Sequence, residues 1–335
     1  MGEEEGLFIM KSKQIIEYVE TNGVKQYLLH NRSSDSGAPV LLIVHGGPGG
    51  PDSNAAHKFK AWWKDLFHLV SWDQRAAGKT LAANGEPPSY PVTVPDILSD
   101  MGAIIAHLKE SYGAEKVYLL GISWGTLLCS LYTLEHPEDV KMYIAAGQVT
   151  NFYRSEQVAY EKVKEAVTAA GDPKDIALLE SISPYPELPF GPDSDAVEKK
   201  MPVLKRLQVK YGYAMKLTLP LIVAYLFGPA SKLSEFSYYS KKNADKRKEY
   251  NAELLTYLFD FEILDHGPEY SAPICYITGD RDYTTTSSLA IEYFEKIVAP
   301  KKLHCPISGA GHNMMFDQPE AFAQALAKAK ALAES

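Results

Sequence analysis

Short apolar runs rich in β-branched residues alternate along the chain with segments in which apolar residues recur every three or four positions. The runs VLLIVH, FHLVSW and VYLLG have the first pattern, which is typical of buried strands. From about Pro95 to Tyr112 the second pattern predicts a helix, with Ile97, Ile104 and Leu108 on its apolar face. This alternation of strand and helix predicts a mostly parallel sheet flanked by helices.

Both ends of the chain continue this pattern with small differences. Two extended runs, IIEYVETN and GVKQYLLHN, meet at Asn22-Gly23, a dipeptide that favours a tight turn between antiparallel strands. Near the other end, PICYITGDRD and KLHCPIS predict strands on either side of a helix through IEYFEKI, and a last helix begins near Pro319. The chain therefore opens with a predicted hairpin and closes with further strand and helix units.

The pattern changes between Gln148 and Tyr270, where helical segments, tyrosines and proline-rich loops replace the buried strands. A stretch of this length does not form one structureless loop in a compact protein. We therefore predict a helical cap domain at 148–270, inserted into a core made of 1–147 and 271–335.

The segment VYLLGISWGTLL joins a predicted strand to a predicted helix through Gly121, Ser123 and Gly125. A G-x-S-x-G sequence in this setting is the nucleophile elbow of the α/β-hydrolase fold, in which a sharp turn exposes the serine above the sheet. The two glycines allow the strand and the helix to approach closely. We therefore predict the α/β-hydrolase fold with Ser123 as its nucleophile.

A serine nucleophile needs a base, and the base needs an acid that orients it. His312, in a glycine-rich turn after the last predicted strand, is our candidate base, and Asp282, in the loop after the preceding strand, is our candidate acid. Asp280 is a second acid in that loop, for which we expect a turn-capping role or a pair with Arg281. The order of nucleophile, acid and base agrees with the α/β-hydrolase order.

Two backbone N–H groups would stabilise the oxyanion of a tetrahedral intermediate. The residue after the nucleophile, Trp124, supplies one of them, and Gly47 in the loop after VLLIVH is the candidate for the other. We interpret His45 as a structural residue of that loop. Asp73 and Arg75 are interpreted as an ion pair that fixes their own loop.

Composition narrows the class of protein. The chain has 335 residues, 46% of them hydrophobic, and a formal net charge of −8, which argues against nucleic acids and anionic membranes as partners. The acidic N-terminal sequence does not resemble a secretory signal. Three cysteines, Cys129, Cys275 and Cys305, lie in apolar segments without metal-ligand spacing. We expect a cytoplasmic protein without integral membrane association.

Several motifs together resemble those of the proline iminopeptidases, serine peptidases of the α/β-hydrolase fold. They are HGGPGG at 45–50, WDQRAAGKT at 72–80, GISWGTLL at 121–128, TGDRD at 278–282 and GAGHN at 309–313. The resemblance implies a helical cap, release of N-terminal residues from short peptides, and no cofactor. Where such peptidases usually have Gly followed by another residue, this chain has Ala76-Ala77, a difference that we expect to alter only packing.

The predicted cap contains the candidate substrate-binding residues. Family peptidases are expected to hold the substrate's amino group with cap carboxylates, but the usual Trp-Glu motif is absent from this sequence. The candidates by location are Gln148, Glu156, Glu249 and Glu253. A solvated position on a helix is the alternative interpretation of each glutamate.

Three functions compete on these residues. The first is an aminopeptidase of the iminopeptidase type acting on a small molecule or short peptide. The second keeps the triad but acts on an ester or lactone, because the apolar segment from Leu217 to Phe227 and the many tyrosines of the insertion could bind an acyl group. The third is a ligand-binding protein without catalysis, which is disfavoured because candidates for every catalytic position are present. The sequence does not predict the oligomeric state.

Overall fold

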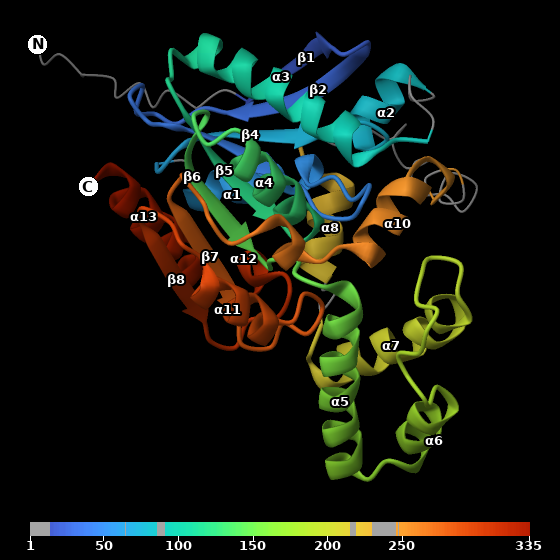
Figure 1. Ribbon diagram of the computed structural model, residues 1–335. Coiled ribbons are helices and arrows are strands. Elements are labelled where there is room, and N and C mark those ends of the chain that lie inside the picture. Colours follow the sequence, from blue (N-terminus) through green and yellow to red (C-terminus); the bar gives the residue numbers. More distant parts are fainter. Residues whose placement is uncertain (1–13, 64, 86–90, 215–218, 230–245, 247) are drawn as a thin grey trace, which may run out of the picture.

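A computed structural model describes residues 14–63, 65–85, 91–214, 219–229, 246 and 248–335. Its centre is one sheet of eight strands in the order β1-β2-β4-β3-β5-β6-β7-β8 (Figure 1). The pairs from β4 to β8 are parallel, whereas β1, β2 and β4 pair in antiparallel fashion. This mostly parallel sheet confirms the predicted α/β-hydrolase fold.

The predicted strands are all present. Their bounds are β1 (Gln14–Thr21), β2 (Val24–Asn31), β3 (Val40–Val44), β4 (His68–Asp73), β5 (Val117–Ile122), β6 (Val140–Ala146), β7 (Ile274–Gly279) and β8 (Lys302–Ile307). Asn22 and Gly23 join β1 to β2 with φ values of 52° and 72°. Both values are positive, as the predicted tight hairpin turn requires.

Helices cover both faces of the sheet, because successive side chains of a buried strand point to opposite faces. One face packs against α3 (Val94–Tyr112), α4 (Trp124–Glu135) and α11 (Ser287–Lys296). The other face packs against α1 (Ala56–Trp63), α12 (Met314–Asp317) and α13 (Pro319–Glu334). Two short helices, η1 (Ser53–Ala55) and α2 (Gly78–Asn84), follow β3 and β4.

The chain between β6 and β7 adds further helices. They are α5 (Phe152–Ala170), α6 (Pro173–Ser181), η2 (Ala196–Lys200), α7 (Met201–Tyr211), α8 (Leu219–Phe227), α10 (Ala252–Asp260) and η4 (Ile263–His266). Figure 1 shows α5, α6 and α7 projecting away from the sheet as a lobe. This lobe has its own buried cluster, which includes Val163, Leu179 and Leu204.

The last part of the same interval, from α10 to Tyr270, packs against the core. Leu254 and Leu258 of α10, together with Ile263 and Tyr270, belong to the buried cluster on the α3 and α4 face of the sheet. The interval predicted as a cap therefore has two parts, a projecting lobe and a segment that packs on the core. No helix in the described ranges has both the length and the apolar character needed to cross a membrane.

Candidate active site

The turn between β5 and α4 holds Ser123 in an unusual conformation. Its φ of 52° and ψ of −120° lie outside the regions that non-glycine residues commonly occupy. The Ser123 N–H donates to the carbonyl oxygen of Ala146 at the end of β6, at 2.9 Å. Such strain persists only where the surrounding structure enforces it, and it is often found at functional sites.

The glycines on either side of Ser123 explain how this turn fits. A Cβ atom added to Gly125 would overlap the carbonyl oxygen of Val44 in β3. One added to Gly121 would lie 2.7 Å from the carbonyl oxygen of Gly125. Both positions require glycine, because α4 starts in direct contact with the neighbouring strands.

The loop after β3 lies against the same serine. A Cβ atom on Gly46 would be 3.3 Å from the Ser123 Cβ, so the loop backbone approaches the serine side chain. Gly47 has a φ of 125°, and an added Cβ would lie 2.5 Å from the Gly49 nitrogen. The predicted oxyanion loop is therefore next to Ser123 and depends on glycine for its shape.

A buried network that the sequence did not reveal connects this loop to the elbow. The Trp124 indole N–H donates to Gln74 Oε1 at 3.2 Å, and the Gln74 side-chain amide donates to the His45 carbonyl oxygen at 3.0 Å. His45 accepts the Gln74 backbone N–H at Nε2, and its Nδ1 lies 2.7 Å from the Gly46 carbonyl oxygen. Burial lowers the pKa of His45, against the opposing effect of Asp73. His45 is thus a neutral structural residue of the loop.

His312 and Asp282 lie together at the ends of β8 and β7. The His312 Nδ1 is 2.9 Å from Asp282 Oδ2, and the Asp282 side chain is fully buried. Its other oxygen accepts the backbone N–H groups of Thr284 and Thr285 at 2.9 and 3.1 Å. Burial alone would raise the pKa of Asp282, but His312 and these N–H groups outweigh it and lower that pKa below its usual value.

Asp280 has a different role. Its carboxylate accepts the Gly309 N–H at 2.8 Å and the Ser308 hydroxyl at 3.0 Å. It therefore fixes the turn that precedes His312, rather than capping its own turn or pairing with Arg281. Of the two acids in this loop, the structure brings Asp282 to His312.

Gly147, the residue after β6, lies between the two halves of the site. A Cβ atom on Gly147 would be 3.3 Å from both His312 Cε1 and Asp282 Oδ2. Its neighbour Ala146 accepts the Ser123 N–H, as described above. Ser123 is therefore at the same edge of the sheet as the Asp282–His312 pair.

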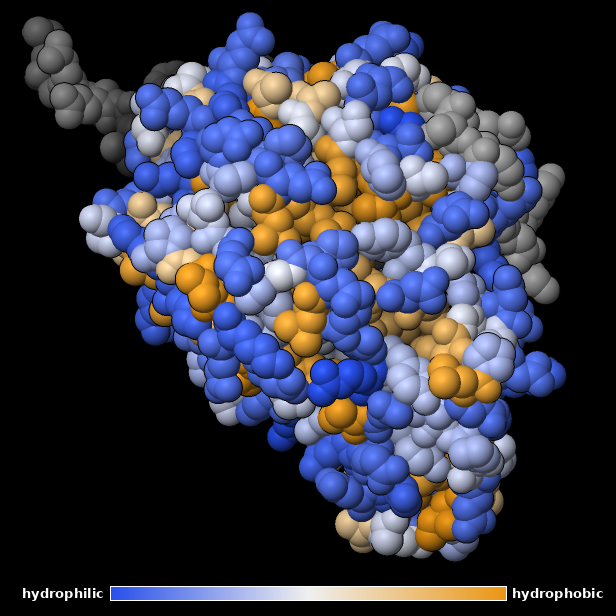
Figure 2. Space-filling model, viewed as in Figure 1, coloured by the Kyte–Doolittle hydropathy of each residue, from blue (hydrophilic) through white to orange (hydrophobic). Residues whose placement is uncertain are grey.

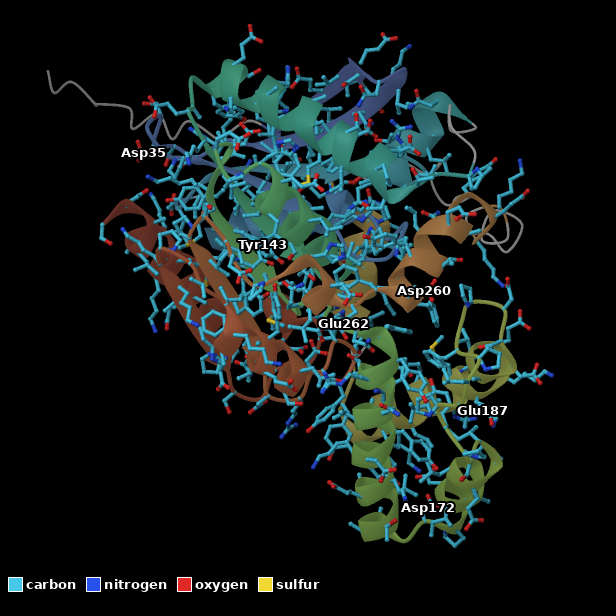
Figure 3. The ribbon with its side chains drawn as sticks, in the orientation of Figure 1. Asp35, Tyr143, Asp172, Glu187, Asp260 and Glu262 are labelled. Atoms are coloured by element: carbon cyan, nitrogen blue, oxygen red, sulfur yellow. The ribbon has the colours of Figure 1, made fainter. Side chains whose placement is uncertain are left out.

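Gln148 follows Gly147 but points into the core. It is 1% exposed, its Oε1 lies 2.5 Å from the Tyr143 hydroxyl, and its Nε2 donates to the Val149 carbonyl oxygen. Tyr143 lies at the centre of the molecule in Figure 3. Both polar groups of Gln148 are thus engaged inside the protein, so its placement does not favour contact with a substrate.

The three glutamate candidates are in unlike environments. Glu156 on α5 is completely buried, where its carboxylate accepts the Tyr185 hydroxyl at 2.5 Å and pairs with Lys205 of α7. The solvated position considered for Glu156 is therefore wrong. Glu249 and Glu253, beside the N-terminus of α10, are exposed. The structure does not bring these three residues together.

Two expectations about the WDQR segment are corrected. Arg75 pairs with Asp100 through two contacts of 2.6 Å, whereas Asp73 accepts the Lys79 backbone N–H at 2.8 Å. The predicted pair between Asp73 and Arg75 is wrong, because Asp100 comes from α3, far away in sequence. Ala76 has a φ of 61°, so the replacement of glycine at this position affects the backbone as well as packing.

Asp52, which the sequence analysis did not single out, lies just after the oxyanion loop. It accepts the Tyr225 hydroxyl of α8 at 2.7 Å. Burial raises the pKa of Asp52 to about 6, with a further contribution from Asp73 and opposition from the Tyr225 hydrogen bond. No sequence pattern identifies this pair, because its members are 173 residues apart.

The arrangement matches the needs of acyl transfer, with a strained serine, a histidine with a buried acid, and backbone N–H groups nearby. Within the described residues, no group of three or more His, Cys, Asp or Glu side chains could hold a metal ion.

Comparison with known proteins supports the fold. Residues 39–167 match the family described as the alpha/beta hydrolase fold. A probable aminopeptidase of Bacillus subtilis is 22% identical over 318 residues, which cover 95% of this chain and 96% of that protein. A proline iminopeptidase of Neisseria gonorrhoeae is 29% identical over 130 residues, but the match covers only 39% of each chain.

Solved structures support the fold and leave the reaction open. The crystal structure of a proline iminopeptidase from Mycobacterium smegmatis has a TM-score of 0.63 at 17% identity, covering 95% of this chain and 99% of that one. A membrane phospholipase A and a haloalkane dehalogenase, both 16% identical, have TM-scores of 0.61 and 0.57. The chain thus has the α/β-hydrolase fold, and it is similar to proteins named as aminopeptidases and proline iminopeptidases.

Proposed function

We propose that this protein is a serine hydrolase in which Ser123 is the nucleophile, His312 the base and Asp282 the acid that orients the base. The observation that carries the proposal is the 2.9 Å contact between His312 Nδ1 and Asp282 Oδ2, at the sheet edge that also holds the strained Ser123. A histidine fixed by a buried carboxylate at the same sheet edge as a half-buried serine is the arrangement that activates a hydroxyl.

The proposed mechanism follows from which atoms are engaged. Because Nδ1 of His312 faces Asp282, its Nε2 is the nitrogen left to take the Ser123 proton as the hydroxyl oxygen attacks a carbonyl carbon. The oxyanion would accept the N–H of Trp124, which as the first residue of α4 has no acceptor within the helix, and the N–H of Gly47. His312 would then return the proton to the leaving group, and water would release the acyl group from Ser123.

The proposed substrates are short peptides, from which the enzyme releases the N-terminal residue. The similar proteins named as an aminopeptidase and a proline iminopeptidase favour this class, and the five motifs in the chain resemble those of the proline iminopeptidases. We further propose that 148–270 acts as the cap, with the α5–α7 lobe as its projecting part.

The proposed location of the protein is the cytoplasm. Its three free buried cysteines favour this reducing compartment.

A substrate panel tests this proposal. Wild type and Ser123→Ala would be compared on the p-nitroanilides of proline and other amino acids, each with a free and with a blocked amino group. We expect release from free aminoacyl amides by wild type and a loss of about 10⁴-fold or more in Ser123→Ala. Equal release by the two proteins would contradict the assignment of Ser123, and preference for blocked substrates would contradict the peptidase.

The surface of α8 favours a second candidate, an esterase or lactonase. Tyr225 anchors this helix to Asp52 beside the oxyanion loop, while Leu219 and Phe227 are 73% and 66% exposed. An apolar acyl group would suit the exposed apolar side chains of this helix. Apolar surface also gathers across the middle of the face viewed in Figure 2. Short-chain esters matched to the amides in the panel separate the two functions by their kcat/KM.

A binding protein without catalysis is the remaining class. A fluorophosphonate probe distinguishes it, because such a probe forms a covalent bond only with an activated serine. Labelling of wild type but not of Ser123→Ala would exclude the non-catalytic alternative.

A further inference from the structure

The loop that carries Asp282 is held from outside the core by the α5–α7 lobe. The residue after Asp282, Tyr283, offers its carbonyl oxygen to Nε2 of Gln208 on α7 at 3.0 Å. The Tyr283 N–H donates to the Tyr213 carbonyl oxygen at 3.3 Å. Both backbone groups of this single residue are therefore bound by the segment that ends α7.

A second contact holds the loop from the other helix of the lobe. The Thr286 hydroxyl donates to the Ser155 carbonyl oxygen in the first turn of α5, at 3.2 Å. Between the two attachments, Thr284 and Thr285 donate their N–H groups to Asp282. The backbone that orients the proposed acid is thus hydrogen-bonded to α5 on one side and to α7 on the other.

Gln208 is unusual among the residues that make these contacts. It is completely buried, and its Oε1 has no hydrogen-bond partner in the described part of the chain. A buried amide that satisfies only one side of its hydrogen-bonding capacity adds little to stability. Its donated bond nevertheless fixes the peptide group adjacent to Asp282.

We propose that Gln208 is a positioning residue, through which the α5–α7 lobe holds Asp282 in line with His312. This inference rests on the proposed serine-hydrolase function. Gln208 acts through the Tyr283 carbonyl and does not touch the reacting atoms. Because an acid and base misplaced by about 1 Å can cost about 100-fold in rate, even a modest relaxation of this loop lowers turnover.

The test compares three full-length variants with wild type. Gln208→Met keeps the length of the side chain without its polar groups, and Gln208→Glu keeps the shape without the N–H donors. The control is Leu204→Ala. It removes a buried apolar side chain from the same helix and leaves every hydrogen bond to the Asp282 loop in place. Measurements are the rate of Ser123 labelling by a fluorophosphonate probe, kcat and KM on the best panel substrate, and the thermal midpoint.

Both Gln208 variants should lower the labelling rate and kcat about tenfold, with KM within twofold of wild type. Gln208→Met should keep the thermal midpoint within about 3 °C of wild type. Gln208→Glu should lower the midpoint further, because it buries a carboxylate opposite the Tyr283 carbonyl oxygen. In both Gln208 variants, the low-field NMR resonance of the proton on His312 Nδ1 should lose intensity. Leu204→Ala should lower the midpoint by more than Gln208→Met does, and leave kcat and the resonance unchanged.

The two proposals fail in different ways. If wild type is not labelled at Ser123, the proposed function fails. If wild type is labelled but the Gln208 variants match its labelling rate and kcat, the positioning role of Gln208 alone is overturned. Loss of kcat in Leu204→Ala equal to that in the Gln208 variants would also overturn it, because any damage to the lobe would then suffice.

Discussion

The edge of the sheet and the α5–α7 lobe fix their important side chains by different means. At the edge, glycines allow backbones to touch, as where Gly125 meets Val44 and Gly46 meets Ser123. In the lobe, buried polar side chains pair across helices, as Glu156 does with Lys205 and Tyr185. The first kind of order is specified by a few adjacent residues, and the second needs partners that are distant in the chain.

The strongest expected effect concerns chemistry at the sheet edge. Asp282→Asn should lower kcat by about 10⁴-fold, because an amide no longer stabilises the imidazolium that forms during the reaction. The measurement is kcat on the best panel substrate. Asp280→Asn is the matched control, since its carboxylate only bonds the Ser308–Gly309 turn, and it should retain activity within a few-fold. The reverse ranking of the two variants would show that the wrong aspartate was chosen.

Next in size is a steric test of the backbone contacts at the elbow. Gly125→Ala should destabilise the fold by more than about 4 kcal/mol, because its Cβ would overlap the Val44 carbonyl oxygen. Denaturant unfolding and soluble yield measure this loss. Gly102→Ala, in the middle of α3 with 3.6 Å to its nearest neighbour, should instead stabilise by about 0.5–1 kcal/mol. Similar results for the two glycines would show that the close approach of α4 to Val44 does not require glycine at position 125.

In the lobe, a substitution should lower the stability of the fold while leaving the activity nearly unchanged. Glu156→Gln should cost about 2 kcal/mol in unfolding free energy, because it weakens a buried ion pair with Lys205. We expect kcat/KM for free aminoacyl amides to change by less than about threefold, since the carboxylate is already bound inside the lobe. Urea unfolding and the substrate panel provide the two measurements. A selective loss on substrates with a free amino group would instead assign Glu156 to amine binding.

The smallest effect depends on pH. The raised pKa of Asp52, about 6, means that the folded protein holds this proton more tightly than the unfolded chain does. Its contribution to stability is therefore present at low pH and is lost as the pH rises from about 4 to 6. The rise of about two pKa units corresponds to about 3 kcal/mol, and the partial exposure of Asp52 reduces this value. Asp52→Asn stays neutral and should exceed wild type by about 1–2 kcal/mol at pH 7.5.

Denaturant unfolding at several pH values follows this difference, which should vanish below about pH 4. Tyr225→Phe is the control, because it removes the hydroxyl that opposes the rise in this pKa and should move stability in the other direction at pH 7.5. A difference between Asp52→Asn and wild type that is independent of pH would contradict the assignment.

The same contrast explains what the sequence predicted. The strands, the hairpin turn at Asn22-Gly23 and the elbow follow local patterns, so each could be predicted from a few residues. The order of Ser123, Asp282 and His312 along the chain predicted a triad whose members follow the strands β5, β7 and β8. The structure brings Asp282 and His312 into contact. Their catalytic roles stay a prediction.

The errors share one cause, which is a partner distant in sequence. Arg75 pairs with Asp100 instead of Asp73. Glu156 is buried in the lobe, where it pairs with Lys205, which is 49 residues away in sequence. Gln74 and Gln208 have no motif of their own, and their roles depend on Trp124 and Tyr283. Ala76 is a local exception, since its positive φ was concealed by an alanine where glycine is usual.

The strand order also has a consequence during protein synthesis. A chain made only as far as α4 already contains Ser123 and the glycine loop beside it. The acid and the base follow β7 and β8, and Asp282 and His312 come 159 and 189 residues after Ser123. Under the proposed function, the nascent serine turn cannot attack an acyl group while the ribosome is still extending the chain. Reactivity would begin only when β7 has docked on β6 and β8 on β7.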